Sequence, residues 1–231
     1  DYVVGSAPNF QGIILPSGVT IQGVSGIHSG ATTNFLNNKN PTRITLLGRN
    51  RAIFRIGECT EKIAVKDIEL FASNGEGTYG VEALGAYISS QDIYFENVVF
   101  NAFYRGISVR GLPQTGFNWQ CDYVKLARVR FIYNTDAGIY SNASNTTWKI
   151  QGSLFINPKA SPTQKADSMH FERAATIYIE DTFGGGFPTA RGGTYLKILV
   201  SANVTVINSQ TEAMTNSFVL NEPKIPGAGD Y

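Results

Sequence analysis

The sequence has little net charge and no run of basic residues. Its 231 residues include 19 Lys and Arg and 18 Asp and Glu, which gives a net charge of +1. Proteins that bind nucleic acid usually present a basic patch or stripe to the phosphates, and none stands out here. We therefore expect no nucleic-acid partner.

Long apolar runs and metal-binding motifs are missing as well. No apolar stretch approaches the roughly 20 residues that cross a bilayer, and no charged-then-apolar leader follows Asp1. We expect no membrane insertion, and we expect the chain to be either a mature protein or a piece of a longer one. The only two histidines, His28 and His170, lie far apart and no CxxC occurs, so we expect no metal site and no other cofactor.

What the sequence does contain is a repeat. Residues 93–111, IYFENVVFNAFYRGISVRG, read as a strand of alternating apolar residues, an Asn, a Val-x-Phe step, a variable turn and a second strand of the form Gly-Ile-x-Val-x-Gly. Similar units begin at Ile63, Val124, Trp148, Ile177 and Val204. A repeat of 20 to 50 residues with strands of period two and no amphipathic helix predicts a parallel β-helix.

One position in each unit can be aligned. The aligned residues are Asp67, Asn97, Arg128, Gly152, Asp181 and Asn208. We predict an all-β, single-stranded parallel β-helix of about seven to eight coils in residues 1–221. Residues 1–42 would be an entry strand and loop, residues 43–221 the regular coils, and residues 222–231 a C-terminal loop or linker.

The two cysteines, Cys59 and Cys121, fall two coils apart in this register. Coils stack about 4.8 Å apart, so the α-carbons would be separated by more than the roughly 7 Å that a disulfide tolerates. We predict free thiols.

The pattern resembles the pectate-lyase-like superfamily of right-handed parallel β-helices. The likeness is carried by Pro-Ser-Gly-Val-Thr-Ile-x-Gly from Pro16, by Asn97 and Asn208 at strand ends, and by the Gly-Ile-x-Val-x-Gly strands. It implies a right-handed helix, an extracellular or cell- or virion-surface location, and polysaccharide as the partner. Members include lyases, hydrolases, tailspike glycosidases and adhesins. The resemblance thus leaves open hydrolysis, β-elimination, a non-catalytic adhesin and a structural segment of a surface fibre, either as a homo-oligomer or as part of a larger protein.

Alternation along the second strands places their side chains in columns. If Ile107, Ile139, Met169 and Leu196 point inward, then Ser108, Tyr140, His170 and Lys197 share one outward column. The next outward column holds Arg110, Asn142, Glu172 and Leu199. Such a face supplies the acids, bases and donors that glycan chemistry needs, with His170 able to change charge near neutral pH.

The tripeptide Asn134-Thr135-Asp136 is similar to the motif with which polygalacturonases place a catalytic carboxylate. The next coil offers Asp167, followed by His170, but the match is partial because Ala137 follows Asp136 and the family's Arg-x-Lys is missing. We select Asp136, Tyr140, Asp167, His170 and Glu172 as candidate catalytic residues. The candidate substrate-binding residues are Arg110, Asn142, Lys197 and Trp119.

Two carboxylates would act in hydrolysis, whereas elimination would use Tyr140, His170 or Lys197 as base and Arg110 to neutralise a uronate. Outward polar residues and Asp or Asn at strand ends also occur merely because they face water or cap turns. Among the aromatic residues, Trp119 lies in an insertion, GLPQTGFNWQCDY, that could lean over this face. We predict that Phe100, Phe131, Phe155 and Phe183 form an internal aromatic stack.

Overall fold

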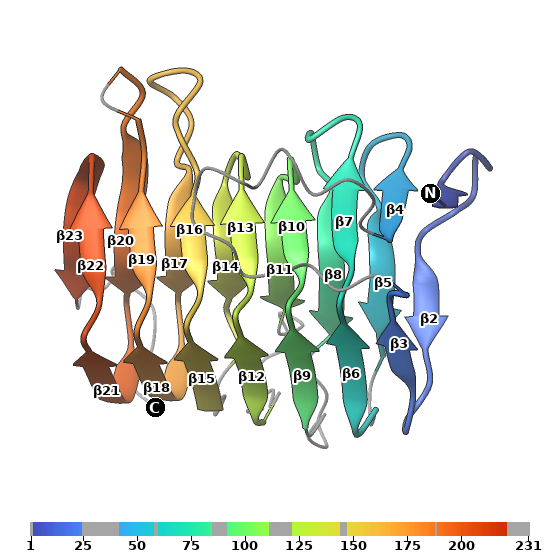
Figure 1. Ribbon diagram of the computed structural model, residues 1–231, viewed down its shortest axis with the longest axis horizontal. Helices are drawn as coiled ribbons and strands as arrows, with labels where there is room; N and C mark the ends of the chain where they lie inside the picture. The colour runs from blue at the N-terminus through green and yellow to red at the C-terminus, as the bar shows by residue number, and fades with distance from the viewer. Residues whose placement is uncertain are drawn as a thin grey trace, which may run out of the picture.

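The fold is a right-handed parallel β-helix, seen in a computed structural model that describes residues 2–24, 42–57, 60–84, 92–110, 122–143, 147–187 and 189–220 (Figure 1). All regular elements among these residues are β-strands, and they belong to three parallel sheets, here called A, B and C, of eight, eight and seven strands. No helix in the described part of the chain is long and apolar enough to cross a membrane. The predicted fold class is confirmed.

Each turn of the chain visits the three sheets in a fixed order. Sheet A contains β1 (Tyr2–Val4), β4 (Arg43–Leu46), β7 (Glu69–Ala72), β10 (Val99–Asn101), β13 (Arg130–Ile132), β16 (Leu154–Ile156), β19 (Phe183–Gly185) and β22 (Gln210–Glu212). Sheet B contains β2 (Ile13–Leu15), β5 (Ala52–Ile56), β8 (Tyr79–Leu84), β11 (Arg105–Arg110), β14 (Ala137–Ser141), β17 (Asp167–Phe171), β20 (Gly192–Ile198) and β23 (Met214–Leu220). Sheet C contains β3 (Thr20–Gln22), β6 (Ile63–Lys66), β9 (Ile93–Glu96), β12 (Val124–Ala127), β15 (Thr147–Gln151), β18 (Ala174–Glu180) and β21 (Ser201–Ile207).

Two details of the chain path differ from the sequence prediction. The Val-x-Phe step, expected as a link between two strands, is a strand of its own in sheet A, such as β10. The region before residue 43, expected as an entry strand and loop, contains β1, β2 and β3, one in each sheet. Strands of three residues are too short to show an alternation by themselves, so the sequence pattern does not reveal them.

The sharp turn from sheet C to sheet A uses a left-handed residue in each of six coils. The aligned positions Asp67, Asn97, Arg128, Gly152, Asp181 and Asn208 all have positive φ, between 47° and 56°. Asn and Asp tolerate this conformation better than most residues. Their side chains also bond from coil to coil, since the Asn97 Nδ2 donates to Asp67 Oδ1 at 3.0 Å and the Asn208 Nδ2 donates to Asp181 Oδ1 at 2.6 Å. The predicted register is therefore confirmed along most of the chain.

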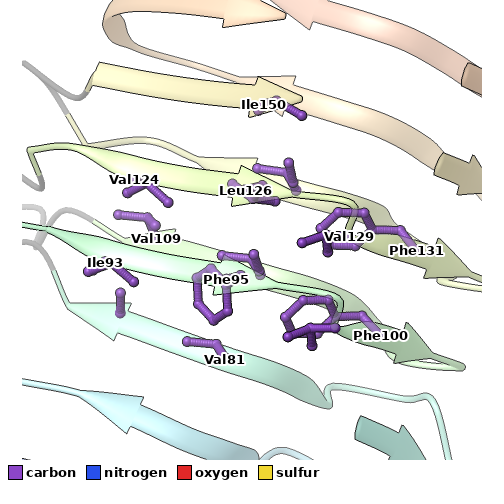
Figure 2. Close-up of a cluster of buried hydrophobic side chains, with 14 of the residues drawn as sticks. Val81, Ile93, Phe95, Phe100, Val109, Val124, Leu126, Val129, Phe131 and Ile150 are labelled. Carbon is purple, nitrogen blue, oxygen red and sulfur yellow. The ribbon is translucent and has the colours of Figure 1, made fainter. Parts of the chain in front are cut away.

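Apolar side chains fill the space enclosed by the three sheets (Figure 2). Phe100, Phe131 and Phe155 stack along the axis with ring centroids 5.0 and 4.7 Å apart and nearly parallel planes. Phe183 does not continue the stack, so that part of the prediction is wrong. Register pairs Phe155 with Gly184 and places Phe183 opposite Leu154, one residue earlier.

A column of glycines makes room for the stacked rings. A Cβ added to Gly106 would lie 2.7 Å from the Phe131 ring, and one added to Gly138 would lie 2.9 Å from the Phe155 ring. In the following coil the large and small residues exchange columns. Gly184 occupies the ring column, and Tyr195, fully buried, fills the space beside it. Large and small side chains thus alternate between two neighbouring columns and keep the interior filled.

Candidate functional site

The outward face of sheet B carries a polar column that is largely shielded from solvent. Register places Ser108 beside Tyr140, Tyr140 beside His170, and His170 beside Lys197, while Ile107, Ile139, Met169 and Leu196 form the buried inward column. The predicted columns are confirmed. Tyr140 and His170 are only 8% and 6% exposed although they face outward, so their polar atoms depend on protein partners more than on water.

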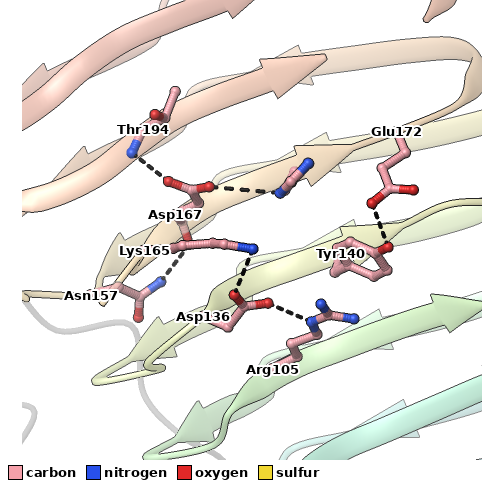
Figure 3. Close-up of polar contacts among 9 residues, drawn as sticks. Arg105, Asp136, Tyr140, Asn157, Lys165, Asp167, Glu172 and Thr194 are labelled. Carbon is pink, nitrogen blue, oxygen red and sulfur yellow. Dashed lines mark hydrogen bonds and ion pairs between the residues drawn. The ribbon is translucent and has the colours of Figure 1, made fainter. Parts of the chain in front are cut away.

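Asp136 lies in the turn before β14, in the corner between sheets A and B. Buried Asn134 fixes this turn, since its Oδ1 accepts from the Phe103 N–H and its Nδ2 donates to the Phe100 carbonyl. Asp136 is 4% exposed, and its carboxylate accepts a hydrogen bond from the Arg105 Nε at 2.6 Å (Figure 3). The Lys165 Nζ lies 3.5 Å from the same carboxylate. Two cations therefore lie beside this carboxylate, Arg105 from the preceding coil and Lys165 from the turn before β17.

Asp167, the first residue of β17, lies on the next coil. Its main-chain N–H donates to the Asp136 carbonyl at 2.9 Å, so the two aspartates are neighbours across one coil step. Asp167 is 5% exposed, and its carboxylate accepts a hydrogen bond from the Thr194 N–H at 2.7 Å. Burial raises the pKa of Asp167 above its ordinary value, although the Thr194 N–H and Lys197 act in the opposite direction. The two neighbouring aspartates thus differ in their partners, because Asp136 is paired with two cations and Asp167 with a main-chain N–H.

His170 completes this group on the same strand. Its Nδ1 lies 3.7 Å from the Asp167 Oδ2, beyond hydrogen-bonding distance, and its ring meets the Tyr140 ring edge-on at 5.5 Å. Burial, with Lys197 nearby, lowers the pKa of His170 to about 4. The imidazole is therefore neutral at pH 7, and its Nε2 is buried without a hydrogen-bond partner among the residues that the structure describes. A neutral imidazole with one unpartnered nitrogen can accept or relay a proton.

Tyr140 is held between charged groups. Its hydroxyl donates to the Glu172 Oε1 at 2.7 Å, and the Arg105 guanidinium lies 3.5 Å from its ring centroid. Burial and Glu172 raise the pKa of Tyr140. Tyr140 is therefore a hydrogen-bond donor at neutral pH and a poor candidate for a base.

The remaining predicted residues divide into two groups. Lys197 lies beside His170 in register, and Asn142 continues the same strand pairing through its N–H to the Val109 carbonyl at 3.2 Å. Arg110 instead bonds Glu82 on the preceding coil and lies over the Tyr79 ring at 5.5 Å, in contacts that do not include the Asp136 group. Trp119 lies outside the described residues, as do Cys59, Cys121 and residues 222–231.

Two residues that the sequence prediction omitted are central to the site. Arg105 contacts both Asp136 and Tyr140, and Lys165 contacts Asp136. Arg105 could have been found from the register, because it pairs with Ala137, the neighbour of Asp136, on the adjacent coil. Lys165 follows a longer turn between β16 and β17, whose path the strand pattern does not determine.

Among the described residues, no group of three or more His, Cys, Asp or Glu is placed to hold a metal ion. What the arrangement offers is acid–base chemistry. Asp136 is paired with two cations, burial raises the pKa of Asp167, and the imidazole of His170 is neutral at pH 7, all on one face of two successive coils. Searches with the chain against protein-family models, curated proteins and solved structures gave no match.

Proposed function

We propose that the outward face of sheet B hydrolyses a glycosidic bond in an extracellular polysaccharide, with Asp167 as the proton donor and Asp136 as the second carboxyl group. The observation that carries the proposal is the contrast between these neighbouring carboxyl groups. Asp136 forms ion pairs with Arg105 and Lys165, whereas burial raises the pKa of Asp167. Glycosidases act with two carboxyl groups whose different environments give them different roles.

The other members of the group then have supporting roles. Tyr140, fixed by Glu172 and Arg105, can donate hydrogen bonds only if Glu172 moves, so its first role is to orient the cluster. Lys165, with its side chain 59% exposed, and Lys197 provide positive charge beside the aspartates. Positive charge would favour an acidic sugar over a neutral one.

The spacing of the aspartates bears on stereochemistry. Adjacent strands lie about 4.8 Å apart, which is near the roughly 5 to 5.5 Å between the carboxyl groups of retaining glycosidases and below the separation of inverting ones. Since Asp136 and Asp167 occupy adjacent coils, we expect the anomeric configuration to be retained. Nuclear magnetic resonance of the first sugar product measures this directly.

The experiment incubates the chain with acidic and neutral polysaccharides and follows reducing ends, unsaturated-uronate absorbance and retention of the protein on the glycan. We expect new reducing ends without absorbance. Asp136→Asn and Asp167→Asn should each lower the rate by about 100-fold or more, as expected for loss of an acid or base. Asp92→Asn is a matched control, because the Asp92 side chain is half exposed, directly precedes β9 in sheet C, and forms an ion pair with Lys125 away from the Asp136 group.

A second candidate is β-elimination with His170 as the base, favoured by its neutral imidazole and unpartnered Nε2. It predicts unsaturated-uronate absorbance that His170→Gln abolishes. Retention on a glycan without either product would contradict both reactions and favour the non-catalytic adhesin. No response to any glycan would favour a structural segment of a surface fibre.

A further inference from the structure

The last coil exposes the apolar side chains that would otherwise be the interior of the solenoid. Val204 and Val206 on β21 continue the inward column of Ile177 and Ile179, and Phe218 and Leu220 on β23 continue that of Leu196 and Ile198. The four preceding residues are at most 1% exposed, whereas Val204, Val206, Phe218 and Leu220 are 40%, 36%, 49% and 55% exposed. Within the described part of the chain, the interior therefore opens to solvent at this end.

Backbone groups are also open here. Strands β21, β22 and β23 are the final strands of sheets C, A and B, and each is paired on one side only (Figure 1). Open strand edges invite pairing with another chain, and proteins usually protect them with charged residues or proline. From Ser201 to Leu220 the sequence contains no proline and one charged residue, Glu212. The last coil lacks these usual protections.

The first coil is different. It also lacks charged residues from Tyr2 to Gln22, and Tyr2 and Ile13 are exposed. Leu15, however, is 2% exposed, and Val4, Phe10, Val19 and Ile21 pack against the core with partial burial. The inward side chains of the first coil are thus covered in part, whereas Val204, Val206, Phe218 and Leu220 of the last coil are all exposed.

We propose that the last coil, from Ser201 to Leu220, is an interface through which two copies of this chain associate end to end. A second copy fits because it offers the same apolar face and edges, and because an almost uncharged coil meets its own copy with little electrostatic repulsion. A twofold axis perpendicular to the solenoid makes the facing edges antiparallel. Such an isologous contact is closed and gives a dimer, whereas contact between the last and first coils would propagate into a fibre.

Sedimentation velocity over a wide concentration range tests the proposal with the full chain. We expect a monomer–dimer equilibrium and no larger species. Leu220→Lys should weaken dimerisation by more than tenfold, because two lysines would face each other across the contact. Ile14→Lys is the matched control at the other end, where Ile14 is 71% exposed, and it should leave the equilibrium unchanged.

Val206→Thr keeps the side-chain shape, so it separates loss of apolar contact from misfolding and should also weaken the dimer. The circular dichroism of each variant should match that of the parent chain. A parent chain that is monomeric throughout would overturn the proposal. So would a series of larger species, or dissociation by Ile14→Lys instead of Leu220→Lys, since both mean that the first coil takes part.

Discussion

At the scale of single residues, His170 reports on the polarity of the candidate site. Burial lowers its pKa from 6.5 to about 4, so the folded protein binds a proton at this residue less readily than the unfolded chain does. The stability associated with neutral His170 is therefore fully present above about pH 6.5 and is lost as the pH falls towards 4.

We predict that His170→Gln removes this dependence. As the pH falls from 7 to 4, the free energy of unfolding of the parent chain should decline relative to the variant by about 2 to 3 kcal/mol. Denaturant titrations at several pH values measure the difference. The comparison of the variant with the parent chain also separates the effect of His170 from that of Asp167. The raised pKa of Asp167 changes the stability in the opposite direction as the pH falls, because protonation of Asp167 favours the folded state. The titration of the imidazole itself, followed by nuclear magnetic resonance, should have its midpoint near 4 and not near 6.5.

A second residue-scale prediction concerns the glycines beside the ring stack. In Gly106→Ala the new Cβ would lie 2.7 Å from the Phe131 ring and 2.8 Å from the Gly138 carbonyl oxygen, so one of them must shift. We expect a loss of about 1 to 3 kcal/mol in the free energy of unfolding, as is usual for overpacked interiors. Gly57→Ala is the control, since among the described residues the nearest atom to its Cβ would be the Thr60 Oγ1 at 3.9 Å. Equal losses in the two variants would contradict the steric explanation.

At the scale of the coil, the aromatic stack tests which phenylalanines form the core. Phe131 is completely buried between two rings, so Phe131→Ala should cost about 3 to 5 kcal/mol. Phe183 lies outside the stack and is only partly buried, so Phe183→Ala should cost about 1 kcal/mol. Chemical denaturation of both variants gives the comparison. Similar losses of stability in the two variants would mean that Phe183 packs in the interior as Phe131 does.

The left-handed turns give a prediction in the stabilising direction. Ala102 has a φ of 62°, which costs an L-residue with a Cβ roughly 1 to 2 kcal/mol. Ala102→Gly should remove that cost and lose some chain entropy, for a net gain of about 0.5 kcal/mol. Ala64→Gly, within strand β6, should instead destabilise the protein, because it adds only the entropy loss. Thermal unfolding of the two variants should shift in opposite directions.

The repeat of the coils also explains how much of the fold could be predicted from the sequence. Period-two alternation in units such as Ile93–Glu96 predicts both the strands and which side chains face inward, and the register then predicts that Tyr140 lies beside His170. Phe183 was misplaced because it follows Asp181 by two residues, whereas Phe155 follows Gly152 by three, and a one-residue offset moves a ring from inside to outside. The cations around Asp136 were not predicted because their positions depend on turns, whose lengths vary from coil to coil.

At the scale of the whole molecule, contacts in a solenoid are made almost entirely between neighbouring coils. Stability therefore depends on having a neighbour on each side, and coils at the ends should open more often than those in the middle. The last coil, with Val204 and Phe218 exposed, should exchange its amide hydrogens faster than β12 to β17, whose inward residues are buried.

End-to-end association changes this expectation in a way that depends on concentration. Pairing of two last coils would give β21 to β23 the neighbour they lack, so their amides should become more protected as the protein concentration rises, by mass action. The central strands already have neighbours on both sides and should exchange at the same rate at all concentrations. Hydrogen exchange measured by mass spectrometry at low and high concentration separates the two regions. Protection of β21 to β23 that does not change with concentration would mean that the open end has no partner in solution, whereas a concentration effect on β1 to β3 would place the contact at the opposite end.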